Sequence, residues 1–171
     1  MTQINPQQAA LRYCSRCGNR LVVQHIDGRE RPTCAICGFV VYLDPKVACG
    51  VLLIHTGRVL LVRRRNEPGR GLWCLPCGFA DADEPPEVAA ARELREEAGL
   101  DATIEGLLGI YHYTDDPRGA GILLIYRASS REATPHAGDD ADDVGFFSSD
   151  NLPPLSHQTH RRALDDWRRT L

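Results

Sequence analysis

Residues 78–100 read GFADADEPPEVAAARELREEAGL, with nine positions at the spacing Gly-x5-Glu-x7-Arg-Glu-Leu-x-Glu-Glu-x-Gly-Leu. Pro85 and Pro86 suit the first turn of a helix, where a missing N–H group costs nothing. Gly99 can adopt the left-handed conformation that commonly ends a helix. The segment therefore predicts a helix over about residues 85–98. We expect four residues at helical spacing to form its apolar face: Val88, Ala91, Leu94 and Ala98.

Three glutamates of this helix are expected to share one face. Glu93, Glu96 and Glu97 stand at i, i+3 and i+4, so their carboxylates converge. Like charges at these spacings destabilise a helix by roughly 0.2–0.5 kcal/mol per pair. Arg92, four residues before Glu96, is placed to relieve part of that repulsion. A hard divalent cation such as Mg²⁺ would relieve it better, since Mg²⁺ prefers carboxylate and water oxygens. The alternative is a solvated, salt-bridged helix face.

The nine positions match the signature box of the Nudix hydrolases, and residues 71–79, GLWCLPCGF, resemble the segment that precedes that box. The resemblance implies an α/β/α sandwich with a mixed β-sheet over residues 45–171. It also implies hydrolysis of the diphosphate bond in a nucleoside diphosphate linked to another moiety. The reaction would depend on Mg²⁺, for which Mn²⁺ can substitute.

Family resemblance also implies roles for the residues of the box. Glu93, Glu96 and Glu97 would hold the metal together with a backbone carbonyl of Cys77 or Gly78. Arg92 would orient the glutamates through hydrogen bonds. Glu93 or a late loop carboxylate would take a proton from the attacking water. The chain departs from the family pattern at three positions: Cys77, where glycine is usual, and Asp81 and Asp83, where glutamate and glycine are common.

Four cysteines near the start form two knuckles, Cys14-x2-Cys17 and Cys34-x2-Cys37, each followed by a glycine. Four thiolates are the tetrahedral set that Zn²⁺ prefers in closed, structural sites. The pattern resembles a zinc ribbon, and we expect it to occupy residues 1–44, ahead of a Nudix domain at residues 45–171. Two disulfides or a redox pair are the alternatives. A third CxxC pair, Cys74 and Cys77, is interpreted as packing rather than redox chemistry.

Composition and charge limit the partners. The net charge is −3, and the ribbon has few aromatic residues for base stacking, so a nucleic-acid partner is not expected. A packing or dimerisation role for the ribbon is favoured, and the resemblance implies a homodimer. The sequence has no apolar run long enough for a membrane span, and its N-terminus lacks the apolar region of a secretory signal. An odd number of cysteines, seven, favours a reducing compartment, and a cytoplasmic location is expected.

The rest of the chain predicts four strands and a closing helix: residues 47–55, 59–65, 102–114 and 121–128, then residues 156–171. Arg63 and Arg64, at a strand end, are candidates for binding substrate phosphates, because guanidinium groups fit phosphate geometry. A solvated strand edge is the alternative. Tyr111 and Tyr113 share a strand face and are candidates for stacking on a substrate ring. Core packing is the alternative for both tyrosines.

Residues 129–143 are polar and acidic and are expected to form a surface loop. The loop holds four aspartates: Asp139, Asp140, Asp142 and Asp143. The family resemblance implies that a late loop carboxylate completes the metal site or acts as general base, and Asp142 and Asp143 hold that relative position. A disordered, solvated loop is the alternative. His157 and His160 on the closing helix have no ligand cluster around them in the sequence, so a metal site there is not expected.

The zinc ribbon ahead of the box resembles two branches of the family. The run from Cys34 through Pro45 to residue 79 is similar to zinc-ribbon ADP-ribose and FAD pyrophosphatases, which release AMP. The other branch, the NADH pyrophosphatases that also remove NAD caps from RNA, carries a Ser-Gln-Pro-Trp-Pro-Phe-Pro array after the box. Residues 101–117 read DATIEGLLGIYHYTDDP and contain no such array. A third hypothesis, of another class, is a catalytically inactive zinc-ribbon module that binds nucleotides.

Overall fold

The computed structural model describes residues 6–131, 134–138 and 140–170, and the chain forms two compact units, Met1–Asp44 and Pro45–Leu171. Each unit has a sheet of its own. Asp139, from the acidic stretch, lies outside the described residues. A search of the described helices finds none long and apolar enough to cross a membrane.

The first unit is a β-hairpin preceded by a single helical turn. The turn is α1 (Pro6–Ala9), and the hairpin pairs β1 (Leu21–Ile26) with β2 (Arg29–Cys34) in antiparallel register. Asp27 and Gly28 connect the strands with φ values of 51° and 75°, as a two-residue hairpin turn of this kind requires. Four of the six residues of β1 are exposed, so the hairpin has little apolar core of its own. A unit of this size needs another source of stability, such as a bound metal.

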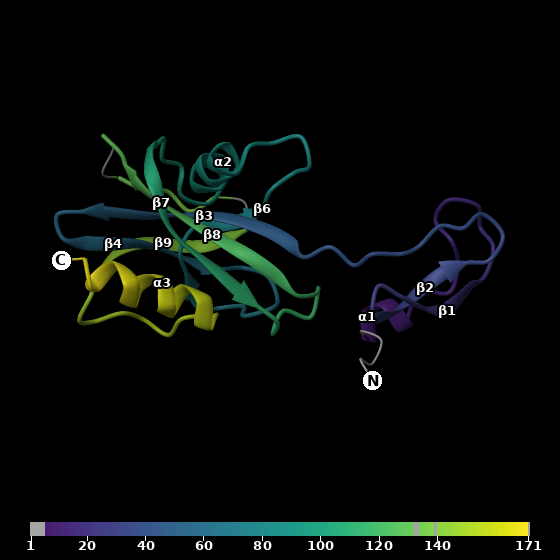
Figure 1. Ribbon diagram of the computed structural model, residues 1–171. Helices are drawn as coiled ribbons and strands as arrows, with labels where there is room; N and C mark the ends of the chain where they lie inside the picture. Colours follow the sequence, from purple (N-terminus) through teal and green to yellow (C-terminus); the bar gives the residue numbers. More distant parts are fainter. Residues whose placement is uncertain (1–5, 132–133, 139, 171) are drawn as a thin grey trace. The chain divides into compact units, whose positions relative to one another are not determined.

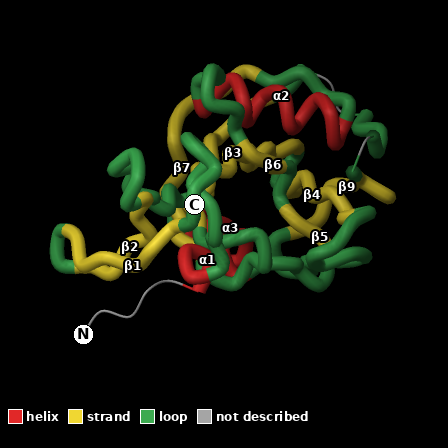
Figure 2. The backbone as a smooth tube through the Cα atoms, turned by 90° about the vertical axis from the view of Figure 1, so that its right-hand side faces the viewer, coloured by secondary structure: helices red, strands yellow, loops and turns green. Residues whose placement is uncertain are grey.

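The second unit is a mixed sheet of seven strands between two helices (Figure 1). Its helices, α2 (Pro86–Ala98) and α3 (Gln158–Arg168), lie on opposite faces of the sheet (Figure 1). In Figure 2, α2 runs along the sheet beside β3 and β6. The strands are β3 (Lys46–His55), β4 (Arg58–Arg64), β5 (Trp73–Cys74), β6 (Cys77–Phe79), β7 (Thr103–Tyr113), β8 (Gly121–Ser129) and β9 (Ala141–Ser148).

The order of neighbouring strands is β5-β4-β3-β8-β7, with β6 paired to β3 and β9 paired to β4. β3 and β8 run parallel, whereas the other pairs are antiparallel. Side chains alternate between the two faces of each strand. Val51 and Leu53 of β3 therefore pack in the core under α2, whereas Leu52 packs in the core under α3. The two cores confirm the sandwich with a mixed sheet that the sequence predicts.

The predicted helix over residues 85–98 is confirmed as α2, with Pro85 before its first residue and Gly99 in the left-handed conformation after its last. The predicted apolar face is wrong in part. Val88 is 51% exposed, and the buried residues are Ala89, Ala90, Leu94, Glu97 and Ala98. Leu94 and Ala98 are buried as predicted, and the buried face also includes a glutamate, which apolar periodicity does not select.

The acidic stretch is also more structured than predicted, because β9 begins inside it at Ala141. β9 pairs antiparallel with β4, and its register runs from Arg58↔Ser148 to Arg64↔Ala141. Asp142 and Asp143 are exposed. These two adjacent charged residues interrupt the alternation of apolar and polar residues by which a strand is recognised from sequence.

The structure accommodates Cys77 because the residue opposite it is a glycine. Gly50 of β3 pairs with Cys77 of β6, and a Cβ built on Gly50 would lie 2.5 Å from the Cβ of Cys77 and 2.5 Å from the carbonyl oxygen of Pro76. Both distances are shorter than real Cβ contacts. The absence of a side chain at Gly50 thus leaves room for the side chain of Cys77, at a position where glycine is usual in the family.

We therefore predict that Gly50→Ala lowers the free energy of unfolding by about 1–3 kcal/mol through overpacking. Adding Cys77→Gly should recover part of this loss, since it removes one of the two close contacts and leaves the other. Urea denaturation of the two single variants and the double variant measures the coupling between the sites. A Gly50→Ala variant as stable as the natural protein would contradict this packing.

Candidate active site and cysteine cluster

The three glutamates at the end of α2 differ in their surroundings. Glu97 is 8% exposed, and its Oε2 accepts a hydrogen bond from the backbone N–H of Cys77 at 3.0 Å. Glu93 lies against the backbone of Gly78, where an added Cβ would come within 2.2 Å of its Oε1. Glu96 is more open, with 40% of its side chain exposed. Strand β6 thus lies closely against two of the three carboxylates.

Arg92 connects most of the other carboxylates of the box. Its Nε and Nη2 donate to the two oxygens of Glu84 at 2.9 and 3.0 Å, and Nη2 also donates to the carbonyl oxygen of Phe79 at 3.1 Å. Its Nη1 donates to Glu93 Oε1 at 2.8 Å and to Glu96 Oε2 at 2.9 Å. Among the described residues, the second oxygens of Glu93 and Glu96 have no hydrogen-bond partner. Arg92 therefore orients both glutamates without occupying them fully.

Burial disfavours the charged forms of two of these carboxyl groups, Glu93 and Glu97. Burial raises the pKa of Glu97 to about 9, and the nearby charge of Glu93 adds to the effect. Burial also raises the pKa of Glu93, although the hydrogen bond from Arg92 works in the opposite direction. A buried carboxylate of this kind is stable as an anion only if a cation compensates its charge.

An open recess is lined by Glu93, Glu96, Glu97 and Asp140. All four offer carboxylate oxygens, the donors that hard cations such as Mg²⁺ and Mn²⁺ prefer. The residues present therefore fit a divalent metal of this class. Asp140 was not among the aspartates chosen from the sequence. It precedes β9 directly, and its Oδ1 accepts a hydrogen bond from Asn66 Nδ2 at 2.7 Å.

A cavity of about 220 Å³ opens beside this recess and shares Glu93, Glu97 and Asp140 with it. Arg64 and Tyr113, two of the predicted substrate residues, line this cavity. The histidines of the closing segment, His157 and His160, also line it. The cavity therefore combines an acidic side with a wall that carries a guanidinium group and aromatic rings.

Two other predicted substrate residues lie elsewhere. Arg63 and Arg64 lie on opposite sides of β4. The Cζ atom of Arg63 lies 5.9 Å from the centroid of the Trp73 ring, and its Nη2 lies 3.7 Å from Asp143 Oδ2. Tyr111 is 2% exposed, and its hydroxyl donates to Asp166 Oδ2 at 3.0 Å. Tyr111 therefore contributes to the core under α3, the alternative that the sequence left open.

The two aspartates chosen from the sequence also lie outside the cavity and the recess. Asp142 accepts a hydrogen bond from Arg65 Nε at 3.0 Å, and Asp143 faces Arg63. Within the acidic run chosen from the sequence, the structure places Asp140 at the recess, and the functional role of these aspartates stays a prediction. The pairing of β9 with β4 extends to Ala141, and Asp140 lies directly before it.

His160 is the functional candidate for which the sequence gave the weakest signal. It is 2% exposed, and its Nδ1 accepts a hydrogen bond from the backbone N–H of Leu75 at 3.3 Å. Burial lowers the pKa of His160 to about 3, so the ring is neutral at ordinary pH. Its Nε2 lies 3.9 Å from Cys77 Sγ. Cys74, the partner of Cys77 in the third CxxC, is fully buried.

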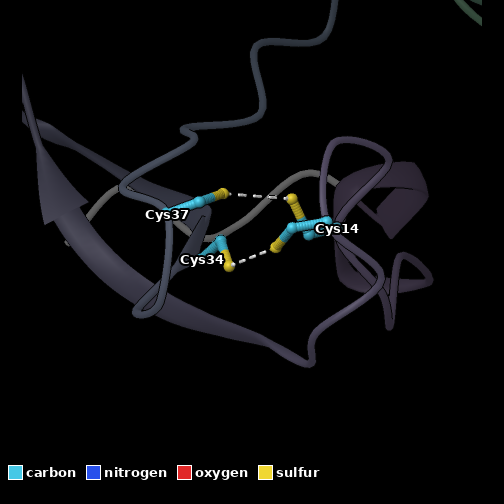
Figure 3. A group of neighbouring side chains, drawn as sticks. Cys14, Cys34 and Cys37 are labelled. Carbon is cyan, nitrogen blue, oxygen red and sulfur yellow. Dashed lines mark hydrogen bonds between the residues drawn. The ribbon is translucent and has the colours of Figure 1, made fainter.

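The four N-terminal cysteines of the first unit come together at one point (Figure 3). Their Sγ atoms all lie within 4.8 Å of one another, with 3.7 Å between Cys14 and Cys37 and 3.5 Å between Cys17 and Cys34. These distances are far longer than the roughly 2.05 Å of a disulfide bond. Gly18 and Gly38 turn the backbone at φ values of 73° and 72°, as the knuckle pattern requires. The arrangement is compatible with a closed, four-thiolate zinc site.

Comparison with known proteins agrees with this geometry. The NUDIX domain model matches residues 44–167. The ADP-ribose pyrophosphatase of Methanocaldococcus jannaschii is 37% identical over 129 residues, which cover 75% of this chain and 76% of that protein. The NAD-capped RNA hydrolase NudC of Pseudomonas aeruginosa is 30% identical over 151 residues, which cover 86% of this chain and 51% of that protein. The chain thus spans about half the length of this second relative.

Among solved structures, the crystal structure of a NUDIX hydrolase from Nitrosomonas europaea matches with a TM-score of 0.81 and 28% identity. The match covers 90% of this chain and 88% of that one. These findings confirm the family, the hydrolase class and the fold predicted from the box. Since the domain match extends over nearly all of the second unit and includes all three glutamates, the protein is a hydrolase of the Nudix family.

Proposed function

We propose that this protein hydrolyses the diphosphate bond of a nucleoside diphosphate linked to another moiety, with ADP-ribose or FAD as substrate and AMP as a product. The observation that carries the proposal is the recess of four carboxylates beside a cavity that Arg64 also lines. A diphosphate needs both features, because its oxygens are anionic and the reaction adds charge to them. The relative named an ADP-ribose pyrophosphatase supports this choice of substrate.

The metal would be Mg²⁺, with Mn²⁺ as a substitute. Glu93, Glu96 and Glu97 would hold it, with a backbone carbonyl of Cys77 or Gly78. When bound, such an ion polarises phosphoryl oxygens and lowers the pKa of a water molecule.

The chain's own residues would supply positioning and proton transfer. Arg92 holds Glu93 and Glu96 in place through the two hydrogen bonds that its Nη1 donates. Arg64 would attract the substrate phosphates, and Tyr113 would contact a ring of the substrate. Asp140, oriented by Asn66, would accept the proton of the attacking water. Its place on the recess supports it over Asp142 and Asp143.

The first unit, residues 1–44, would be a structural zinc ribbon held by Cys14, Cys17, Cys34 and Cys37, ahead of a Nudix domain at residues 45–171. We also propose a homodimer in the cytoplasm. The odd number of cysteines, seven, favours a reducing compartment.

Hydrolysis of NADH or of NAD caps on RNA is the second candidate. The similarity to NudC over 86% of this chain favours it. The proline-rich array expected of that branch is missing from residues 101–117, which supports the first candidate. An inactive nucleotide-binding module is a candidate of another class, and the complete set of carboxylates around the recess argues against it.

We predict that Glu97→Gln lowers kcat by about 100-fold or more, because a metal ligand of this type contributes several kcal/mol to the transition state. Glutamine has the same shape and can still accept the hydrogen bond from Cys77. Release of AMP from ADP-ribose, FAD and NADH, measured with Mg²⁺, gives both the effect and the substrate order. Undiminished turnover in Glu97→Gln would refute the metal assignment, whereas faster cleavage of NADH would favour the second candidate.

We predict that Asp140→Asn lowers kcat by about 10²-fold or more, because it removes the proposed base. Asp142→Asn is the matched control, since it breaks an exposed ion pair that is worth about 0–1 kcal/mol. Turnover of the control should stay close to that of the natural protein. Equal losses in both variants would mean that the acidic stretch acts through its overall charge.

We predict one zinc ion per chain, bound by the four N-terminal cysteines. Metal binding of this kind is worth roughly 10–16 kcal/mol, so a strong chelator should unfold the hairpin. Elemental analysis of the purified protein measures the zinc, and protease sensitivity of residues 1–44 after chelation measures the unfolding. A protein without zinc, whose mass is lower by the hydrogens lost in two disulfides, would show that the cysteines are oxidised instead.

A further inference from the structure

We propose that His160 is a positioning residue, which fixes the segment that holds the carboxylate of Glu97. This inference rests on the proposed function, because it concerns the metal site of that reaction. The segment is residues 75–77, between β5 and β6. His160 contacts it from α3, on the other face of the sheet from the helix that carries the glutamates.

The first contact fixes both the segment and the ring. His160 Nδ1 accepts the hydrogen bond of the Leu75 N–H at 3.3 Å, and both residues are almost fully buried. A neutral imidazole whose Nδ1 accepts a hydrogen bond carries its hydrogen on Nε2. Nδ1 is therefore engaged with the backbone and is not available to act as a base or as a metal ligand.

The other contacts hold the next two residues of the same segment. The carbonyl oxygen of Pro76 accepts a hydrogen bond from the Val51 N–H at 3.0 Å. The N–H of Cys77 donates to Glu97 Oε2 at 3.0 Å. Three successive residues are thus tied to α3, β3 and α2 in turn.

Little flexibility remains between the first contact and the last. Pro76 lies between Leu75 and Cys77, and its ring fixes φ near −65°. A Cβ built on Gly50 would lie 2.5 Å from the carbonyl oxygen of Pro76 and 3.2 Å from the Cα of Cys77. The segment is therefore packed closely against β3. A shift at Leu75 must therefore move the N–H of Cys77. We infer that the position of the Glu97 carboxylate depends on a hydrogen bond to a histidine that does not touch it.

The test compares three substitutions at position 160 with a control on the same helix. In His160→Asn, Oδ1 is bonded to Cγ as Nδ1 is, so it can accept the hydrogen bond from Leu75. In His160→Gln, the amide reaches the place of Nε2 and leaves Leu75 without its acceptor. His160→Leu removes both polar positions. Leu164→Val, in the core under α3, weakens packing without changing the hydrogen bond.

The main measurement is the affinity of each full-length variant for Mn²⁺ in the absence of substrate. Titration calorimetry or electron paramagnetic resonance detects the bound ion. His160→Leu and His160→Gln should weaken Mn²⁺ binding by about tenfold. This is the lower end of the roughly 10–100-fold loss of affinity seen when a residue that orients a metal ligand is replaced. His160→Asn should restore affinity close to that of the natural protein. Leu164→Val should lower the melting temperature and leave Mn²⁺ affinity unchanged. In turnover assays the affected variants should lose kcat, with KM for the nucleotide little changed.

Natural affinity in both His160→Leu and His160→Gln would overturn the proposal. Retention in His160→Gln with loss in His160→Asn would also overturn it, because Nε2 would then act directly in the cavity. If His160→Leu fails to fold, as its circular dichroism would show, the comparison of His160→Asn with His160→Gln decides alone. A natural protein that neither binds Mn²⁺ nor releases AMP would refute the proposed function itself, a result distinct from these.

Discussion

The buried carboxylate of Glu97 is the constraint on which the active-site end of the sandwich depends. Arg92 compensates Glu84, Glu93 and Glu96, but among the described residues no ion pair reaches Glu97. Its one hydrogen bond comes from a backbone N–H, which cannot balance a full charge in a buried place. The fold therefore makes the anion of Glu97 unfavourable unless a cation binds at the adjacent recess of carboxylate oxygens. A divalent cation is the simplest group that satisfies this arrangement.

Much of this architecture could be read from the sequence because it follows local rules. The apolar runs in β3 and β4 indicate strands buried on both faces, and Gly99 ends α2 in the left-handed conformation as expected. The spacing of Glu93, Glu96 and Glu97 places the three carboxylates at the end of one helix. Knuckles of cysteine and glycine likewise predict a four-sulfur cluster, because each knuckle brings two thiols together over a few residues.

The features that sequence reasoning missed depend on contacts between distant segments. β9 forms because it pairs with β4, and only that pairing separates Asp140 at the recess from Asp142 and Asp143 outside it. Arg63 and Arg64 are neighbours in the sequence, yet strand alternation directs only Arg64 into the cavity. Val88 of α2 is exposed, whereas Glu97 is among the buried residues of that helix. Apolar periodicity does not select Glu97, because it is a charged residue at a buried position of the helix.

The two proposed metal sites of the chain differ in a way that suits two different tasks. The cysteine cluster has four thiols close enough to surround one ion, and a soft, closed set of this kind would hold Zn²⁺ permanently. The recess on the second unit is lined by oxygens alone and is open on one side. A hard ion held there would keep positions for water and for phosphate oxygens. Ligand chemistry is thus enough to separate a metal that stabilises a fold from a metal that meets a substrate.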